Sequence, residues 1–168
     1  MSPEPTTIAY LAGVIDSDGY ITASSSTRGG RTYCAPRVGI SGTRREPHDL
    51  AASIYGGTVR SYEPKDDRSH HRTQYQWVLE GDGAATVIAA VLPYLLVKRA
   101  QAQLALQLQE ARLEARAART DEDSYPWAPS GYDPTPAMVA LAEDIRALNV
   151  RGRELDGRTW DEFPAVSA

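Results

Sequence analysis

The segment Leu11–Gly19, which reads LAGVIDSDG, constrains this chain more than any other part of the sequence. Apolar residues at helical spacing surround two very small residues, Ala12 and Gly13, and lead to two carboxylates. A glycine inside a helix costs about 1 kcal/mol relative to alanine, so it indicates that another backbone comes close. Carboxylates such as Asp16 and Asp18 oppose the dipole at a helix C-terminus unless a positive charge lies there, and a divalent cation would supply it. A solvated Asp-Ser-Asp-Gly turn is the competing interpretation of the last residues.

The rest of the chain alternates helices with strands. Pro5-Thr6-Thr7 predicts a helix start with a threonine N-cap, and Gly19 predicts a left-handed helix end. Strands are expected at about 19–26, 32–41, 58–63 and 72–80, and helices at about 7–17, 47–56, 83–92, 93–118 and 135–149. Two helix–strand–strand units then give an α+β fold, in which four strands form one antiparallel sheet backed by helices.

Alternation along the strands assigns one face of this sheet to the core, through residues such as Ile21, Val38 and Trp77. The free face carries Thr, Ser, Gln, Arg and Tyr. Arginine and glutamine can pair with guanine and adenine edges, and a β-ribbon fits a major groove. The candidate DNA-binding residues are Thr22, Ser24, Ser26, Arg28, Arg31, Tyr33, Arg37, Arg60, Tyr62, Arg72, Gln74 and Gln76. An ordinary solvated face is the alternative, and the expected lack of outward acidic side chains favours nucleic acid.

Length and composition set the remaining bounds. The 168 residues predict a single domain over 1–168, with a core at about 6–118 and a C-terminal helix and tail at 135–168. The single cysteine, Cys34, excludes an internal disulfide and predicts a buried filler. No signal peptide or membrane span is evident, so we expect a protein that is not secreted, in a bacterial or phage-infected cytoplasm or an organelle matrix.

The charge distribution is uneven. The net charge is −4, which opposes strong non-specific binding to DNA. The stretch from Gly19 to Arg45 nevertheless holds no acidic residue and five arginines, namely Arg28, Arg31, Arg37, Arg44 and Arg45. The predicted strand region is therefore a basic surface that permits specific binding.

LAGVIDSDG resembles the signature motif of the LAGLIDADG homing endonucleases, with seven of its nine letters identical. Leu92–Leu95, followed by Lys98 and Gln101, is similar to the family's second landmark, and Ile145–Asn149 is similar to a late helix of its single-motif members. The chain has one copy of the motif, which suits the single-motif, homodimeric branch. The resemblance implies a saddle-shaped DNA-binding sheet.

The resemblance also implies roles for particular residues. Asp18 takes the position of the metal-ligand aspartate, assisted by the main-chain carbonyl of Ser17, and Lys98 takes that of the basic residue near the cleaved phosphate. The family's best-known homodimers carry a glutamine after the second strand, and we assign Arg44 as its catalytic substitute. The expected dimer interface consists of Leu11, Ala12, Gly13 and Asp16.

The function implied is sequence-specific cleavage of double-stranded DNA by phosphodiester hydrolysis at a homodimer seam. The expected cofactor is Mg²⁺, with Mn²⁺ able to substitute and Ca²⁺ supporting binding without cleavage. The expected partner is a long, roughly palindromic DNA duplex, and the gene would belong to a mobile element such as an intron. A catalytically degenerate relative that regulates transcription or assists splicing is the alternative, and an unrelated α+β structural protein is the third. The presence of Asp18 and Lys98 favours the enzyme.

Overall fold

The computed structural model describes residues 3–63, 72–118, 132 and 134–150. In chain order the elements are α1 (Pro5–Asp18), β1 (Gly19–Arg28), β2 (Arg31–Gly42), α2 (Glu46–Tyr55), β3 (Val59–Tyr62), β4 (Gln74–Glu80), α3 (Asp82–Val91), the 3₁₀ turn η1 (Leu92–Tyr94), α4 (Arg99–Ala117) and α5 (Pro136–Leu148). The strands form one antiparallel sheet in the order β1-β2-β4-β3. The predicted α+β architecture is confirmed.

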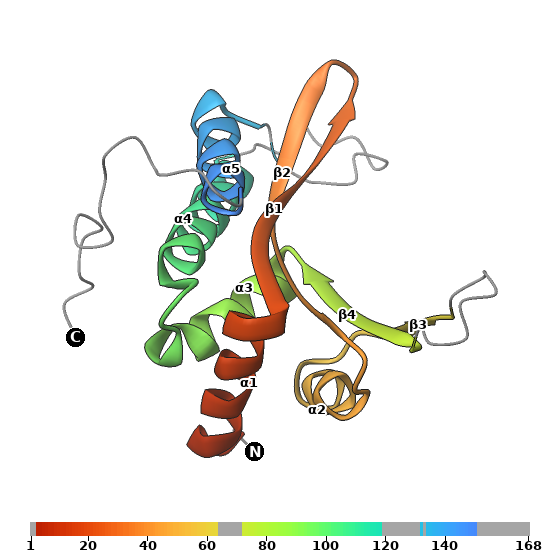
Figure 1. The fold of residues 1–168 in the computed structure, drawn as a ribbon. Helices are drawn as coiled ribbons and strands as arrows, with labels where there is room; N and C mark the ends of the chain where they lie inside the picture. The colour runs from red at the N-terminus through yellow and green to blue at the C-terminus, as the bar shows by residue number, and fades with distance from the viewer. Residues whose placement is uncertain (1–2, 64–71, 119–131, 133, 151–168) are drawn as a thin grey trace.

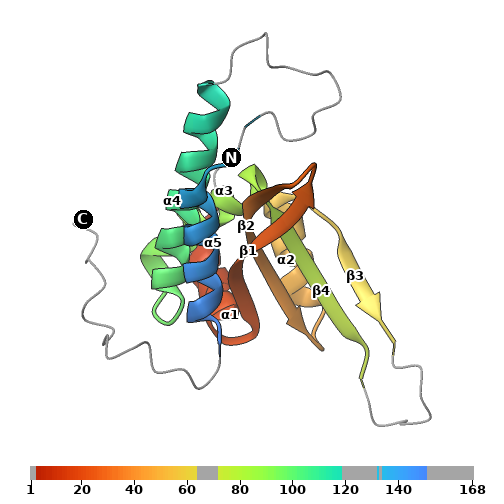
Figure 2. The ribbon, with the colours of Figure 1, turned by 90° about the horizontal axis from the view of Figure 1, so that it is seen from above.

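The helices lie on one side of the sheet, and the strands curve around an open face on the other (Figures 1 and 2). Leu11 and Ile15 of α1 pack into the core with Ile21, Val38 and Trp77 of the strands, as the alternation predicted. Cys34 is buried on the same face, which confirms its predicted role as a filler. Among the described residues, no helix combines the length and the apolar character that crossing a bilayer requires.

Pro36 lies where the ladder between β2 and β4 ends. Its partner in β1 is Ala23, whereas the pairing of β2 with β4 begins one residue later, at Arg37. Proline cannot donate to a ladder, so it is tolerated at a position where the second neighbouring strand has stopped. The carbonyl oxygen of Pro36 accepts from the amide of Gly81, which closes the turn from β4 into α3.

The last described helix belongs to the same core. Met138, Ala142 and Ile145 of α5 are fully buried, so α5 packs into the same hydrophobic core as the preceding elements. Arg146 and Asn149 donate to the outer carbonyl oxygens of β1, with 3.2 Å from Arg146 Nε to Ala23 O and 2.9 Å from Asn149 Nδ2 to Ile21 O. The helix thereby covers a sheet edge that would otherwise be open to pairing. The predicted tail at 151–168 lies outside the described residues.

Two predictions for α1 are wrong. The N-cap is Glu4 followed by Pro5, rather than a threonine, since proline suits the first helical position. Gly19 has φ −99° and begins β1 instead of ending the helix in a left-handed conformation. A Cβ at Gly19 would lie 2.7 Å from the carbonyl oxygen of Gly39 and 2.7 Å from Cα of Ile15. The glycine is required by the close approach of β2 to the helix end.

The predicted long helix from Pro93 to Ala118 is interrupted. A 3₁₀ turn ends at Tyr94, Leu95 is extended at φ −72° and ψ 137°, and α4 begins only at Arg99. In the intervening loop, residues 95–98, three amides donate hydrogen bonds to the carboxylate of Asp16 in α1. Sequence periodicity cannot reveal this contact.

We predict that Gly19→Ala destabilises the protein by about 1–3 kcal/mol, because the new methyl group meets backbone atoms that cannot move independently. Urea unfolding followed by circular dichroism measures the change. Gly83→Ala is the matched control, since its Cβ would meet the Leu79 side chain at an ordinary 3.7 Å. Its stability should change by no more than about 1 kcal/mol. Equal stability of the two variants would contradict the close-approach argument.

Candidate active site and nucleic-acid interface

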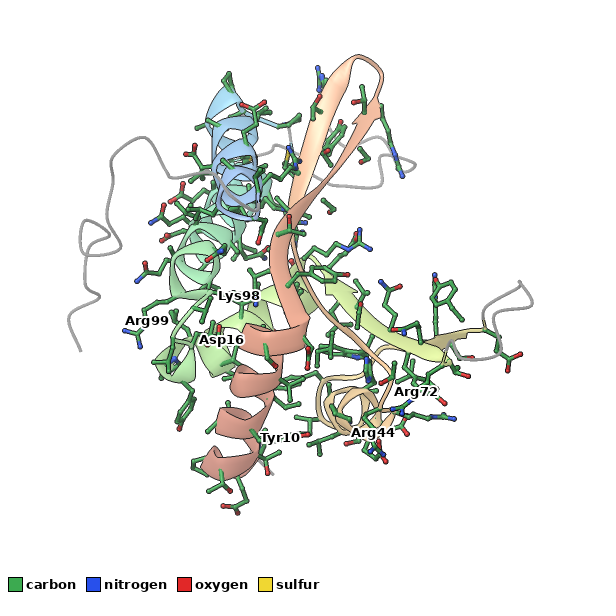
Figure 3. All side chains as sticks on the ribbon, viewed as in Figure 1. Tyr10, Asp16, Arg44, Arg72, Lys98 and Arg99 are labelled. Carbon is green, nitrogen blue, oxygen red and sulfur yellow. The ribbon has the colours of Figure 1, made fainter. Side chains whose placement is uncertain are left out.

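The C-terminal turn of α1 meets the loop 95–98, although the two segments are eighty residues apart in sequence. Asp16 makes this contact with its carboxylate. Oδ2 accepts from the amides of Leu96 at 2.7 Å and Val97 at 3.2 Å, and Oδ1 accepts from the amide of Lys98 at 2.9 Å. Figure 3 shows Asp16 and Lys98 side by side at the end of α1. The predicted metal-ligand turn and the predicted basic residue are therefore brought together.

Lys98 Nζ donates to the main-chain oxygen of Asp16. The ammonium thus lies at the C-terminal end of α1, where the helix dipole is negative. Burial lowers the pKa of the Lys98 side chain below its ordinary value, and the nearby Asp16 and Asp18 carboxylates counteract part of that shift. The Lys98 ammonium therefore supplies positive charge at the helix end where the sequence predicted a metal ion.

Asp18 and Ser17 lie exposed at the last turn of α1. The Ser17 hydroxyl is 3.3 Å from both the Val14 carbonyl oxygen and Asp18 Oδ2, so it can donate to either. The described residues of one protomer contain no group of three His, Cys, Asp or Glu side chains that could hold a metal. Asp18 offers a carboxylate of the kind that Mg²⁺ prefers, but one protomer supplies only part of a coordination sphere.

The residues of the expected dimer interface differ in exposure. The side chains of Leu11 and Ala12 are fully buried within the protomer, and the Asp16 carboxylate is bonded to amides of its own chain, while the interface itself stays a prediction. Only Gly13 of the predicted set is exposed, and apart from its chain neighbours and the backbone of its own helix, no described atom lies within 4 Å of the place where its Cβ would be.

A different set of residues forms an exposed surface along α1. Thr6, Tyr10, Gly13 and Ser17 recur at helical spacing and are all exposed, with 51% of Tyr10 accessible to solvent. Beside the end of α1, the loop residues Leu96 and Val97 are 85% and 56% exposed. We call these six residues the α1 surface. Its exposed apolar side chains are unusual for a surface with no partner.

On the open face of the sheet, polar side chains of three strands lie side by side. Ser41, Gln76 and Arg60 are paired in one row across β2, β4 and β3. A hollow of about 370 Å³ is lined by Arg37, Thr58, Arg60, Gln76, Val78 and Glu80. These side chains combine hydrogen-bond donors and acceptors, as recognition of base edges requires.

Glu80 corrects the expectation that this face carries no acidic side chain. Its Oε1 is 3.4 Å from Nε of Arg37, the residue opposite it in the ladder. The alternation of β4 already placed Glu80 on the outward face with Gln74 and Gln76, so the sequence contained the signal. Arg37 therefore forms an ion pair with a carboxylate on the same face.

The other predicted DNA-binding residues are spread along the open face. Ser26, Arg28 and Arg31 are exposed near the tip of the β1–β2 hairpin, and Thr22 and Ser24 are partly buried. Tyr33 stacks edge-on against Tyr132, with 5.7 Å between ring centroids. Toward the opposite edge of the sheet, at β3 and β4, the exposed members are Arg60, Tyr62, Arg72 and Gln74.

Arg44 is not part of the arrangement around Lys98. It lies exposed just before α2, apart from Asp16 and Lys98 in Figure 3. Its main-chain oxygen is bonded to Nδ1 of the buried His48 at 2.8 Å. The catalytic role that the sequence assigned to Arg44 stays a prediction.

Comparison with solved structures identifies the architecture. The homing endonuclease I-CvuI, in complex with its target in the presence of 2 mM Ca, is 24% identical, with 89% of this chain and 85% of that chain covered at a TM-score of 0.59. The archaeal intron-encoded homing endonuclease I-Vdi141I, complexed with DNA, is 15% identical. The match covers 90% of this chain and 89% of that chain at a TM-score of 0.62. The meganuclease I-SmaMI, bound to uncleavable DNA, is 14% identical. The match covers 90% of this chain and 46% of that chain at a TM-score of 0.57.

The chain has the LAGLIDADG homing endonuclease fold. The resemblance predicted from the nonamer is thus confirmed at the level of architecture, and identities below 25% establish no more than that. No protein-family model matches the chain, and no curated protein does.

Proposed function

We propose that this chain is a sequence-specific DNA endonuclease that acts as a homodimer and uses Mg²⁺. The observation that carries the proposal is the junction of α1 with the loop 95–98, where an exposed carboxylate and a fixed ammonium lie at the same helix end. Phosphodiester hydrolysis needs a metal ligand and a cation close to the phosphate. A polar, open sheet face on the same scaffold could hold the duplex.

Dimerisation is inferred from the incompleteness of one protomer. A second copy packed against the α1 surface would bring a second Asp18 to the same place, and the exposed Gly13 would allow the helices to approach closely. The matched unit covers 46% of the I-SmaMI chain, which leaves room there for a second unit of similar size. A two-fold arrangement implies a long, roughly palindromic target.

Asp18 would hold Mg²⁺ through its carboxylate, with the main-chain oxygen of Ser17 as a further hard donor. Mg²⁺ bound there would lower the pKa of a bound water and stabilise charge on the phosphate. Lys98 places its ammonium at the same helix end, where it would attract the scissile phosphate and stabilise negative charge. We expect Mn²⁺ to substitute for Mg²⁺, and Ca²⁺ to support binding alone.

The second candidate is a DNA-binding protein that has lost cleavage. The observation in its favour is the position of Arg44, which lies exposed just before α2 and apart from Asp16 and Lys98. Such a protein would bind DNA through the same sheet face as a transcription regulator or splicing factor. The intron-encoded origin of I-Vdi141I favours the nuclease and an origin in a mobile intron.

We predict that Asp18→Asn abolishes cleavage while leaving affinity for DNA unchanged or slightly higher, because it removes the negative charge that binds the cation. Nicking assays in Mg²⁺ and mobility shifts in Ca²⁺, on duplexes from the region flanking the gene, measure the two effects. Asp144→Asn, a change of the same kind on the exposed side of α5, should leave both unchanged. Wild-type cleavage by the Asp18→Asn protein would refute the proposed metal site.

We predict that Gly13→Leu converts a dimer into a monomer without unfolding the helix. Leucine forms helices better than glycine by about 0.8 kcal/mol, and the position is open in the protomer, so circular dichroism should report a folded chain. Light scattering after size exclusion measures the mass, with Gly83→Ala as the dimeric control. A wild-type monomer that cuts both strands would contradict the two-fold site.

We predict that Arg37→Ala and Gln76→Ala each relax preference at particular base pairs by about 1–3 kcal/mol. Glu80→Gln should relax the preference read by Arg37 while it raises affinity for unrelated DNA, because it frees Arg37 and removes a charge that repels phosphate. Selection from randomised duplexes measures preference, and Arg116→Ala on α4 serves as the control. A uniform loss of affinity for all sequences would instead assign Arg37 and Gln76 to the phosphate backbone.

A further inference from the structure

Asp16 is a carboxylate that the proposed mechanism does not use, yet it accepts three hydrogen bonds from amides of the loop 95–98. We propose that Asp16 is the positioning residue for Lys98. Its carboxylate holds the backbone of residues 96–98, and its main-chain oxygen receives the Lys98 ammonium. The inference deepens the proposed function and rests on it for its catalytic consequence.

The geometry holds Lys98 at both ends. The Lys98 amide donates to Asp16 Oδ1 at 2.9 Å, and Nζ of the same residue donates to the oxygen of the Asp16 peptide. Lysine has four rotatable side-chain bonds, so one anchored end would leave the ammonium free to move. Two anchors on a single residue fix the ammonium relative to the end of α1.

The same contacts place a charged group from each segment at the helix end of the other. Lys98 is the N-cap of α4 and, in the described part of the chain, no side chain of its own segment caps that helix. The Asp16 carboxylate arrives there from α1, where a negative charge is favourable. In return Lys98 brings a positive charge to the C-terminal turn of α1, which has no basic residue of its own. Each helix therefore supplies the charge that the other lacks.

Leu95 is buried in the core, but residues 96 and 97 have little besides Asp16 to hold them. Leu96 and Val97 are largely exposed, so their side chains add little burial, and their amides would otherwise bond to water. Three amides converge on one carboxylate, and bonds to a charged acceptor are stronger than neutral ones. An asparagine at 16 offers one acceptor oxygen, and its NH₂ group cannot accept from an amide. Asp16→Asn is therefore expected to release the loop while the rest of α1 stays packed.

Lysine labelling gives a direct measurement, because the chain contains only two lysines, Lys65 and Lys98. With lysine labelled with ¹³C at Cε, the metal-free and DNA-free protein should give two signals, and Lys65→Arg assigns them. We expect the Lys98 signal of the Asp16→Asn protein to move toward the position of free lysine and to sharpen. Asp144→Asn should leave it in place. An unchanged Lys98 signal in a folded Asp16→Asn protein would overturn the proposal.

Cleavage tests the catalytic consequence. A displaced ammonium should slow single-turnover cleavage by Asp16→Asn about 10–100-fold. DNA affinity in Ca²⁺ should stay within about twofold of wild type, since the sheet face is untouched. A parallel loss of affinity, or an unchanged rate, would overturn the positioning role. If the wild type cleaves no duplex, the proposed nuclease function fails, whereas the lysine spectrum still decides whether Asp16 positions Lys98.

A measurement on the wild type covers the case in which Asp16→Asn does not fold. Amide hydrogen exchange at residues 96–98 should be slow, although the loop is exposed, because all three amides are bonded to Asp16. Exchange at the rate of an unstructured peptide would contradict the proposal.

Discussion

The close approach of β2 to the end of α1 is the constraint on which the rest of the structure depends. Gly19 allows it, because any side chain there would collide with the carbonyl oxygen of Gly39. The chain consequently turns from helix to strand within one residue. That turn directs Leu11 and Ile15 into the core and leaves Tyr10 and Gly13 on the outside of the same helix. One contact between backbones thus decides which side of α1 belongs to the protomer and which side is open.

The sequence predicted the sheet well because its signals are local. Alternation of side chains identified the buried faces of the strands, and Gly29-Gly30 marked the hairpin turn with two residues of positive φ. The last predicted helix, at about 135–149, begins where expected, and its N-cap Thr135 accepts from the amide of Met138 at 3.4 Å. These features depend on residues within a few positions of each other, so no knowledge of the folded chain was needed.

The differences around the candidate site concern contacts between distant segments. Asp16 was assigned to a dimer interface because its bonds to residues 96–98 cannot be read from a motif. Ala12 is buried within the protomer, and helical spacing could not show this, since it places a residue on a side of the helix but does not say what covers that side. Arg44 was assigned a catalytic role from its position after the second strand in the sequence. In the structure it lies just before α2, apart from Lys98. The roles of Asp18 and Lys98 themselves stay predictions.

The β1–β2 hairpin extends beyond the end of β4, as Figure 1 shows. Of the tip residues, Ser25–Arg31 are all exposed, so substitutions among them remove nothing from the core. Apart from Gly29 and Gly30, whose positive φ favours glycine, variation in this arm therefore carries little penalty in folding stability. A gene encoding this fold can alter the surface that the arm presents by successive single mutations, each of which leaves a folded protein. The architecture separates the part of the chain that must be conserved for folding from a part that is free to diverge.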